Sequence, residues 1–167
     1  MVLLRKYFRI LAFFAVFGKV TANVTISIGD VSVSGYTEDI VVPVNVTNPE
    51  NSVGGFQFDI LAVPTLIELS GSSVIDSDNF STDYNVFDDG SGRVVFYSNN
   101  DGGIALGGDN IVMNLHYDGS NILSANLDLE AYDLIVSNEN GDIIESNIQN
   151  GSITIGDVVI INATIDT

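Results

Sequence analysis

The sequence predicts an all-β protein, an antiparallel two-sheet β-sandwich of about nine strands. Two observations support this fold class. After residue 22, apolar and polar residues alternate in short runs rich in β-branched and aromatic side chains, and no run has the 3.6-residue period of an amphipathic helix. Clusters of Gly, Asn and Asp separate these runs, as expected for turns between paired strands.

Eight segments have the clearest strand pattern, and each is bounded by turn-forming residues. In chain order they are residues 24–28, 39–47, 56–62, 67–69, 93–98, 110–117, 125–130 and 151–155. Three segments with a weaker pattern are residues 83–87, 134–137 and 143–146. Within 39–47, Pro43 lacks an amide hydrogen, which favours an edge strand or a β-bulge at this position.

The stretch VGGFQFDILAVPTLIEL, residues 53–69, separates two sets of side chains. Successive residues of a strand point to opposite sides of the sheet. Phe56, Phe58 and Ile60 therefore belong to the core. The alternate residues, which include Gln57 and Asp59, face outward, where they meet either water or a partner.

The first 22 residues have the order of a secretory signal peptide. Three basic residues precede the apolar run 10–17, and Val20, Thr21 and Ala22 offer small residues for cleavage. The run is shorter than the ~20 residues of a membrane-spanning helix. We therefore expect a signal peptide at 1–22, a single secreted domain at 23–156, and a C-terminal tail or truncated linker at 157–167, with no membrane insertion after cleavage.

The predicted mature chain is strongly acidic. Four of the five basic residues lie in the first 22 residues, and all 22 acidic residues follow them, so Arg93 is the one strong cation left and the net charge becomes −21. Such a surface repels phosphates, which argues against nucleic acid and anionic lipid as partners. The chain has no cysteine, so neither disulfides nor thiolate metal sites stabilise it.

The order and spacing of four segments resemble a cohesin domain over residues 24–156. The segments are IVVPVNVTN, VGGFQFDILAVPTLIEL, GRVVFYSNNDGGIALGGDNIVMNLHYDG and LDLEAYDLIVSNENGDIIESNIQNGSITIG. The resemblance implies a jelly-roll sandwich that is extracellular and non-catalytic. It also implies that the domain binds a dockerin module, or another extracellular protein, in a polysaccharide-degrading or cell-surface assembly.

The resemblance also implies where a partner would bind. In the family, the partner lies against one sheet, on the outward residues of the strands that match 53–62 and 93–99. Carried over to this sequence, the partner-binding residues are Gly55, Gln57, Asp59, Arg93, Val95 and Tyr97, with Asn99 and Asp101 at the rim. Tyr and Arg are common anchors of protein interfaces.

A second function class is a carbohydrate-binding or cell-surface adhesion module, because related sandwiches have this architecture and a fold alone does not determine function. Such a module would present a flat row of exposed aromatic side chains to a polysaccharide. Tyr84 and Tyr97 are the candidates that the sequence offers, and there is no Trp. This small number favours a protein partner.

Acidic loops raise the question of a metal ion, and no other cofactor is indicated. Calcium binds six to eight oxygen ligands, which loops rich in Asp and Asn supply. The best candidate ligands are Asp76, Asp78 and Asp83, although no segment matches the EF-hand pattern.

Catalysis is not expected from this sequence. His116 is the only histidine, so no transition-metal set can form around it, and we expect an exposed strand histidine. A serine nucleophile would need His116 as its base within hydrogen-bonding distance, and no G-x-S-x-G elbow is present. A glycosidase would need a cleft lined with aromatic side chains, whereas most Phe residues of the mature chain alternate into the core.

Overall fold

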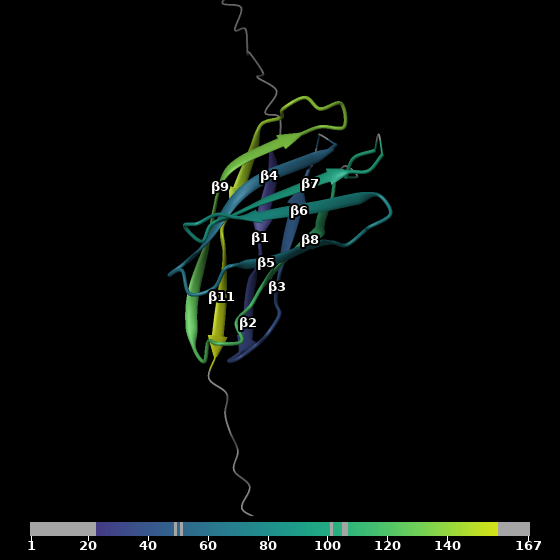
Figure 1. Ribbon diagram of the computed structural model, residues 1–167. Helices are drawn as coiled ribbons and strands as arrows, with labels where there is room; N and C mark the ends of the chain where they lie inside the picture. The colour runs from purple at the N-terminus through teal and green to yellow at the C-terminus, as the bar shows by residue number, and fades with distance from the viewer. Residues whose placement is uncertain (1–22, 49, 51, 101, 105–106, 157–167) are drawn as a thin grey trace, which may run out of the picture.

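The computed structural model describes residues 23–48, 50, 52–100, 102–104 and 107–156, which form two β-sheets. In Figure 1 the strands β4, β7 and β6 of one sheet cross in front of β1, β3 and β8 of the other. The described residues contain no helix that could cross a membrane. The signal peptide and tail predicted at 1–22 and 157–167 lie outside the described residues.

The two sheets contain eleven strands in the described part of the chain. The five-stranded sheet has the order β10-β1-β3-β8-β5, and the six-stranded sheet has the order β2-β11-β9-β4-β7-β6. The strands are β1 (Val24–Ile28), β2 (Asp30–Ser34), β3 (Ile40–Thr47), β4 (Gly55–Val63), β5 (Leu69–Val74), β6 (Phe80–Val86), β7 (Gly92–Ser98), β8 (Asp109–Tyr117), β9 (Ala125–Ser137), β10 (Ser146–Gln149) and β11 (Gly151–Gly156).

Most neighbouring strands are antiparallel, which confirms the predicted sandwich. Each sheet also has one parallel pair at one of its edges, β1 with β10 and β2 with β11, which the sequence did not predict. The chain continues from β1 into β2 and from β10 into β11, and the two continuations pair with each other in the second sheet. Both ends of the domain are thereby built into both sheets.

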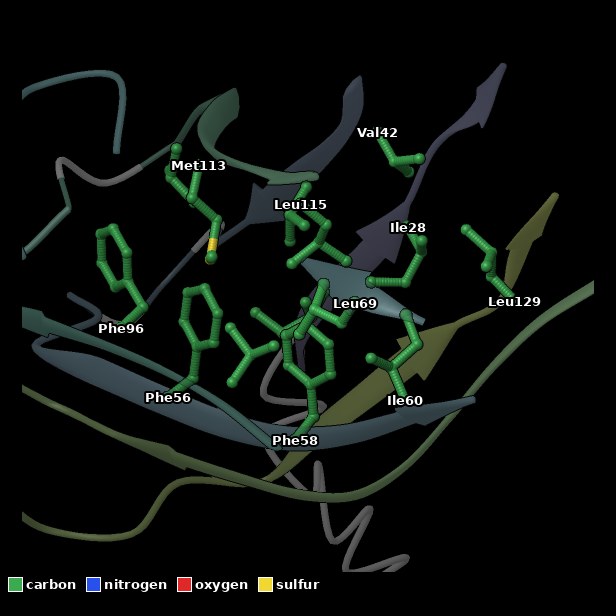
Figure 2. Packing of buried hydrophobic residues seen from close by; sticks show 14 of the residues in the cluster. Ile28, Val42, Phe56, Phe58, Ile60, Leu69, Phe96, Met113, Leu115 and Leu129 are labelled. Atoms are coloured by element: carbon green, nitrogen blue, oxygen red, sulfur yellow. The ribbon is translucent and has the colours of Figure 1, made fainter. Parts of the chain in front are cut away.

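The core lies between the sheets and follows the predicted alternation. Phe56, Phe58 and Ile60 are almost completely buried. Figure 2 shows these three side chains rising from the same side of β4 toward the opposite sheet, where Met113 and Leu115 lie on β8. The rings of Phe56 and Phe96 stack with their centroids 4.8 Å apart.

Several strand boundaries differ from the prediction. Strand β5 covers Leu69–Val74 instead of 67–69, because three serines and a glycine continue it as a polar edge strand. Residues 125–130 and 134–137 belong to one long strand, β9. Strand β2 was not predicted, and residues 143–146 supply only a bridge at Ile143 and the first residue of β10.

Pro43 does not lie on an edge strand, because β3 is paired on both sides, but the predicted bulge is present immediately after it. The register of β3 against β8 shifts between Val44 and Asn45. Strand β1 ends at Ile28, opposite Val44, so Pro43 faces the chain just beyond that strand. Gly29 there donates its N–H to the Pro43 carbonyl. The missing amide hydrogen of Pro43 therefore costs no ladder hydrogen bond.

Tyr117 at the end of β8 carries a polar group into the core. Its side chain is 1% exposed, and its hydroxyl has no hydrogen-bond partner within the described residues. Burial raises the pKa of this phenol, because the charged form would be far from water. The hydroxyl is a local cost to folding.

Replacing Phe58 with Ala should lower the free energy of unfolding by about 3–5 kcal/mol, because a fully buried ring leaves a cavity between the sheets. Gln57→Ala, the neighbouring residue on the opposite side of β4, is the matched control and should change stability little. Chemical denaturation of both variants measures the difference. Equal losses would contradict the assignment of the two faces of β4.

Tyr117→Phe should raise the free energy of unfolding by about 1 kcal/mol, because the substitution removes a buried hydroxyl without a partner and keeps the ring. Tyr97→Phe is the control, since the hydroxyl of Tyr97 belongs to an exposed side chain. Thermal and chemical denaturation check the prediction. Destabilisation by Tyr117→Phe would mean that the hydroxyl is hydrogen-bonded in solution.

Candidate functional site on the outer face of the six-stranded sheet

The outer face of β9, β4 and β7 is organised in rows that cross the three strands. Because residues paired in register lie directly opposite each other, their side chains share one side of the sheet. Three such rows are Ser137, Gly55 and Tyr97; Ile135, Gln57 and Val95; and Tyr132, Asp59 and Arg93. The structure therefore brings the predicted β4 and β7 residues together on one face.

A bulge in β9 adds two apolar side chains that the sequence reasoning missed. Tyr132 and Ile135 are three residues apart, so regular alternation would put them on opposite sides of the sheet. The register shifts between them, and Asp133 has a φ of 52°. Both side chains consequently face outward, with 40% and 46% of their surface exposed. The one available signal was an Asp inside an apolar run, because Asp tolerates positive φ.

A shallow hollow of about 230 Å³ lies over Gly55, between Tyr97 of β7 and Ile135 of β9. A Cβ atom at Gly55 would lie 2.8 Å from the carbonyl oxygen of Phe96, so no larger side chain fits there without a shift of the backbone. Tyr97 at its margin is 46% exposed. The hollow is thus a product of the glycine and has an aromatic and an aliphatic side chain beside it.

Arg93 and Asp59 form an ion pair across β7 and β4. Arg93 Nε and Nη2 donate hydrogen bonds to the two Asp59 carboxylate oxygens at 2.7 and 2.8 Å. The hydrogen bond to Asp59, followed by the charge of its carboxylate, raises the pKa of Arg93. The guanidinium also lies 5.6 Å from the centre of the Phe87 ring.

This pair changes the expected roles of both residues. Asp59 lies on the outward side as predicted, but it is 6% exposed, and its carboxylate is already occupied by Arg93. Two N–H groups of Arg93 already donate to Asp59, so Arg93 does not depend on an acidic group of the partner for its counter-charge. Its side chain is nevertheless 43% exposed. Bidentate pairing holds the guanidinium in one orientation on the β7 side of the face.

Of the two predicted rim residues, Asn99 directly follows β7. Asn99 accepts a hydrogen bond from the Ser81 hydroxyl at 2.7 Å, so its side chain connects the rim to β6. Asp101 lies outside the described residues. Val95 lies opposite Gln57 in the middle row, on the predicted side of the sheet.

The structure does not assemble the predicted calcium ligands. Among the described residues there is no group of three or more His, Cys, Asp or Glu side chains that could hold a metal ion, and Asp76, Asp78 and Asp83 are all described. Asp76 instead accepts hydrogen bonds from the backbone and side-chain nitrogens of Asn79, which stabilises the turn before β6. Asp83 lies within β6 and accepts from the Tyr84 backbone N–H.

His116 lies on a strand, as expected, in the five-stranded sheet, but its side chain is only 24% exposed. Its ring nitrogens contact Ser73 and Asp39, each at 2.8 Å. The sequence reasoning made a serine nucleophile conditional on His116 lying within hydrogen-bonding distance, and Ser73 meets that condition. No sequence motif connects these residues, because they come from three segments that only the sheet brings together.

Known structures similar to this one are cohesins. CaCohA2 of Clostridium acetobutylicum, in a CaDoc0917–CaCohA2 complex, is 26% identical with a TM-score of 0.65 over 80% of this chain and 99% of that chain. A non-cellulosomal cohesin of Archaeoglobus fulgidus is 21% identical with a TM-score of 0.63, over 80% of this chain and 91% of that chain. A type I cohesin–dockerin complex from Clostridium thermocellum matches with 19% sequence identity and a TM-score of 0.63, over 80% of this chain and 99% of that chain.

The protein therefore has a cohesin-like fold, as the order of its sequence segments predicted. No protein-family model and no curated protein sequence matches the chain. The likeness is thus carried by the arrangement of strands more than by residue identity.

The Arg93–Asp59 pair should behave as one unit in stability measurements. Asp59→Ala and Arg93→Ala should each lower the melting temperature, because Arg93→Ala leaves a buried carboxylate without its cation and Asp59→Ala removes the partner of the guanidinium. The melting temperature of the double variant should fall by clearly less than the sum of the decreases in the two single variants. Thermal denaturation of the unaltered chain, the two single variants and the double variant completes this double-mutant cycle. Additive losses would mean that the pair makes no net contribution in solution.

Proposed function

We propose that this chain is a secreted protein-binding module of cohesin type, which holds a dockerin-type partner on the outer face of β9, β4 and β7. The observation that carries the proposal is the set of exposed apolar side chains around the hollow over Gly55. Cohesins of similar structure occur in complexes with dockerins, which supports the choice of partner. The basic and apolar start of the sequence supports secretion.

The chemistry of the face suits a protein partner. Tyr97, Ile135 and Tyr132 provide apolar area, while Gln57 and Arg93 provide directed hydrogen bonds between them. Interfaces commonly combine aromatic and Arg anchors with a surrounding polar rim. The hollow over Gly55 offers a place for one apolar side chain of the partner.

Arg93 contributes through its fixed orientation. Asp59 accepts from Nε and Nη2, which leaves the Nη1 hydrogens for an acceptor on the partner. Because Asp59 already compensates its charge, Arg93 should favour a neutral acceptor such as a backbone carbonyl over a carboxylate. The acidic surface around this face would attract a partner with basic residues and speed its association.

Tyr97→Ala should weaken binding of a dockerin by more than about 1 kcal/mol, because Tyr97 borders the hollow and is an amphipathic side chain with few rotamers. Tyr36→Ala is the matched control. Tyr36 is 53% exposed and follows β2, at the far edge of the same sheet. Titration calorimetry with recombinant dockerin modules from the organism that encodes this chain measures both.

Three results would contradict the proposal in distinguishable ways. Failure of every such dockerin to bind the unaltered chain would reject the partner class. Equal affinities of the Tyr97→Ala and Tyr36→Ala chains would reject the face while keeping the partner. Retention of the chain on insoluble polysaccharide, lost in Tyr97→Ala and Tyr84→Ala, would replace the protein partner with a carbohydrate.

A further inference from the structure

Ser73, His116 and Asp39 form a chain of hydrogen bonds on the five-stranded sheet, on the side away from the core. The Ser73 hydroxyl lies 2.8 Å from His116 Nε2, and His116 Nδ1 lies 2.8 Å from an Asp39 carboxylate oxygen. Ser73 belongs to β5, His116 to β8, and Asp39 immediately precedes β3. These are the three residue types and the two ring nitrogens, in the order in which serine hydrolases use them.

The two neighbours determine where the imidazole proton lies. A carboxylate only accepts hydrogen bonds, so the contact with Asp39 places the proton of the neutral ring on Nδ1. Nε2 is then an acceptor, and the Ser73 hydroxyl donates to it. The serine proton is therefore directed at a base whose orientation Asp39 holds.

Gly71 of β5 lies beside His116 of β8. It is paired with His116 in register, and a Cβ atom at Gly71 would lie 3.4 Å from the His116 Cβ and 3.7 Å from its Cγ. These are ordinary van der Waals distances, so His116 lies close against the backbone of β5 at this residue. The His116 side chain is 24% exposed, so the ring is held by its neighbours and still reached by solvent.

A pocket lies near the end of β5, where Ile75 follows the strand. Ile75 donates its backbone N–H to the Val112 carbonyl, and the side chains of both residues line a pocket of about 420 Å³. Phe80, Ile104 and Ile111 add apolar surface to it. A volume of this size is typical of small-molecule sites. Ser73, His116 and Asp39 do not line this pocket, so an ester carbonyl at the Ser73 hydroxyl would lie outside it.

We propose that Ser73 is an activated nucleophile that accepts acyl groups from small esters. The Ser73 Oγ forms a bond to the ester carbonyl carbon, and His116 Nε2 takes the hydroxyl proton. The bond to the alcohol oxygen then breaks, and the alcohol leaves with that proton. Water repeats the same steps on the acyl-serine, which releases the carboxylic acid and restores Ser73.

The open edge of β5 supplies donors for the negative charge that develops on the carbonyl oxygen. Because the N–H of Ile75 points toward β8, alternation turns the N–H groups of Ser72 and Val74 toward the edge of the sheet, on either side of Ser73. Backbone N–H groups near the nucleophile are the usual donors to such an oxyanion.

The experiment uses the whole secreted chain with two probes, a fluorophosphonate label and p-nitrophenyl butyrate. The label should be found on the peptide that contains Ser73, and Ser73→Ala should abolish it. His116→Gln should slow labelling and ester hydrolysis by roughly 100-fold or more, the usual contribution of a general base. Ser70→Ala is the matched control, because Ser70 is an exposed serine of the same strand whose backbone carbonyl, and not its hydroxyl, accepts a hydrogen bond from Tyr84. It should react like the unaltered chain.

Asp39 acts here as a positioning residue. Asp39→Asn should slow the reaction by about 10-fold or more, because an amide can hold the wrong imidazole tautomer. Asp39→Glu should restore most of the rate. If Ser73 takes up no label in the folded chain, or if the Ser73→Ala and Ser70→Ala chains hydrolyse the ester equally, the proposal is wrong. The hydrogen bonds would then serve only to connect three segments of the sheet.

Discussion

The burial of one side of β4 against the opposite sheet is the constraint on which the other features depend. Phe56, Phe58 and Ile60 are almost completely buried because they pack between the layers (Figure 2). A slip of one residue would turn all three outward, so the register of β4 is strongly determined. The same constraint fixes which residues of β4 face a partner. Stability and the candidate binding face therefore follow from a single alternation.

The outer face departs from that alternation at two places, and both give it specific chemistry. The bulge at Asp133 turns Tyr132 and Ile135 to the same side, so β9 contributes apolar surface that a regular strand would divide. The Arg93–Asp59 pair covers a carboxylate that would otherwise repel an apolar or acidic group. Gly55 leaves the hollow between Tyr97 and Ile135 open, because it has no side chain. A flat polar sheet surface becomes a face with a hollow and a fixed guanidinium.

Sequence reasoning succeeded where one side of a strand is buried and failed where geometry is set by pairing. The alternation in β4 and β7 predicted the core and the outward residues, because a period of two is sufficient for a half-buried strand. Tyr132 faces outward because of the backbone conformation of Asp133, which the alternation does not reveal. The carboxylate of Asp59 is paired with Arg93, which lies 34 positions away in the sequence. The polar edge strand β5 has no apolar alternation to reveal it.

The contacts of His116 illustrate the same limit in a functional setting. Ser73 and Asp39 are far from His116 in sequence and lie next to it only because β5 and β3 flank β8. Packed sheets lie about 10 Å apart, and these residues are on the side of the sandwich opposite the hollow over Gly55. A partner on one face and an ester at the other would therefore not compete for the same side chains. The core between the sheets is what allows one small domain to carry two independent surfaces.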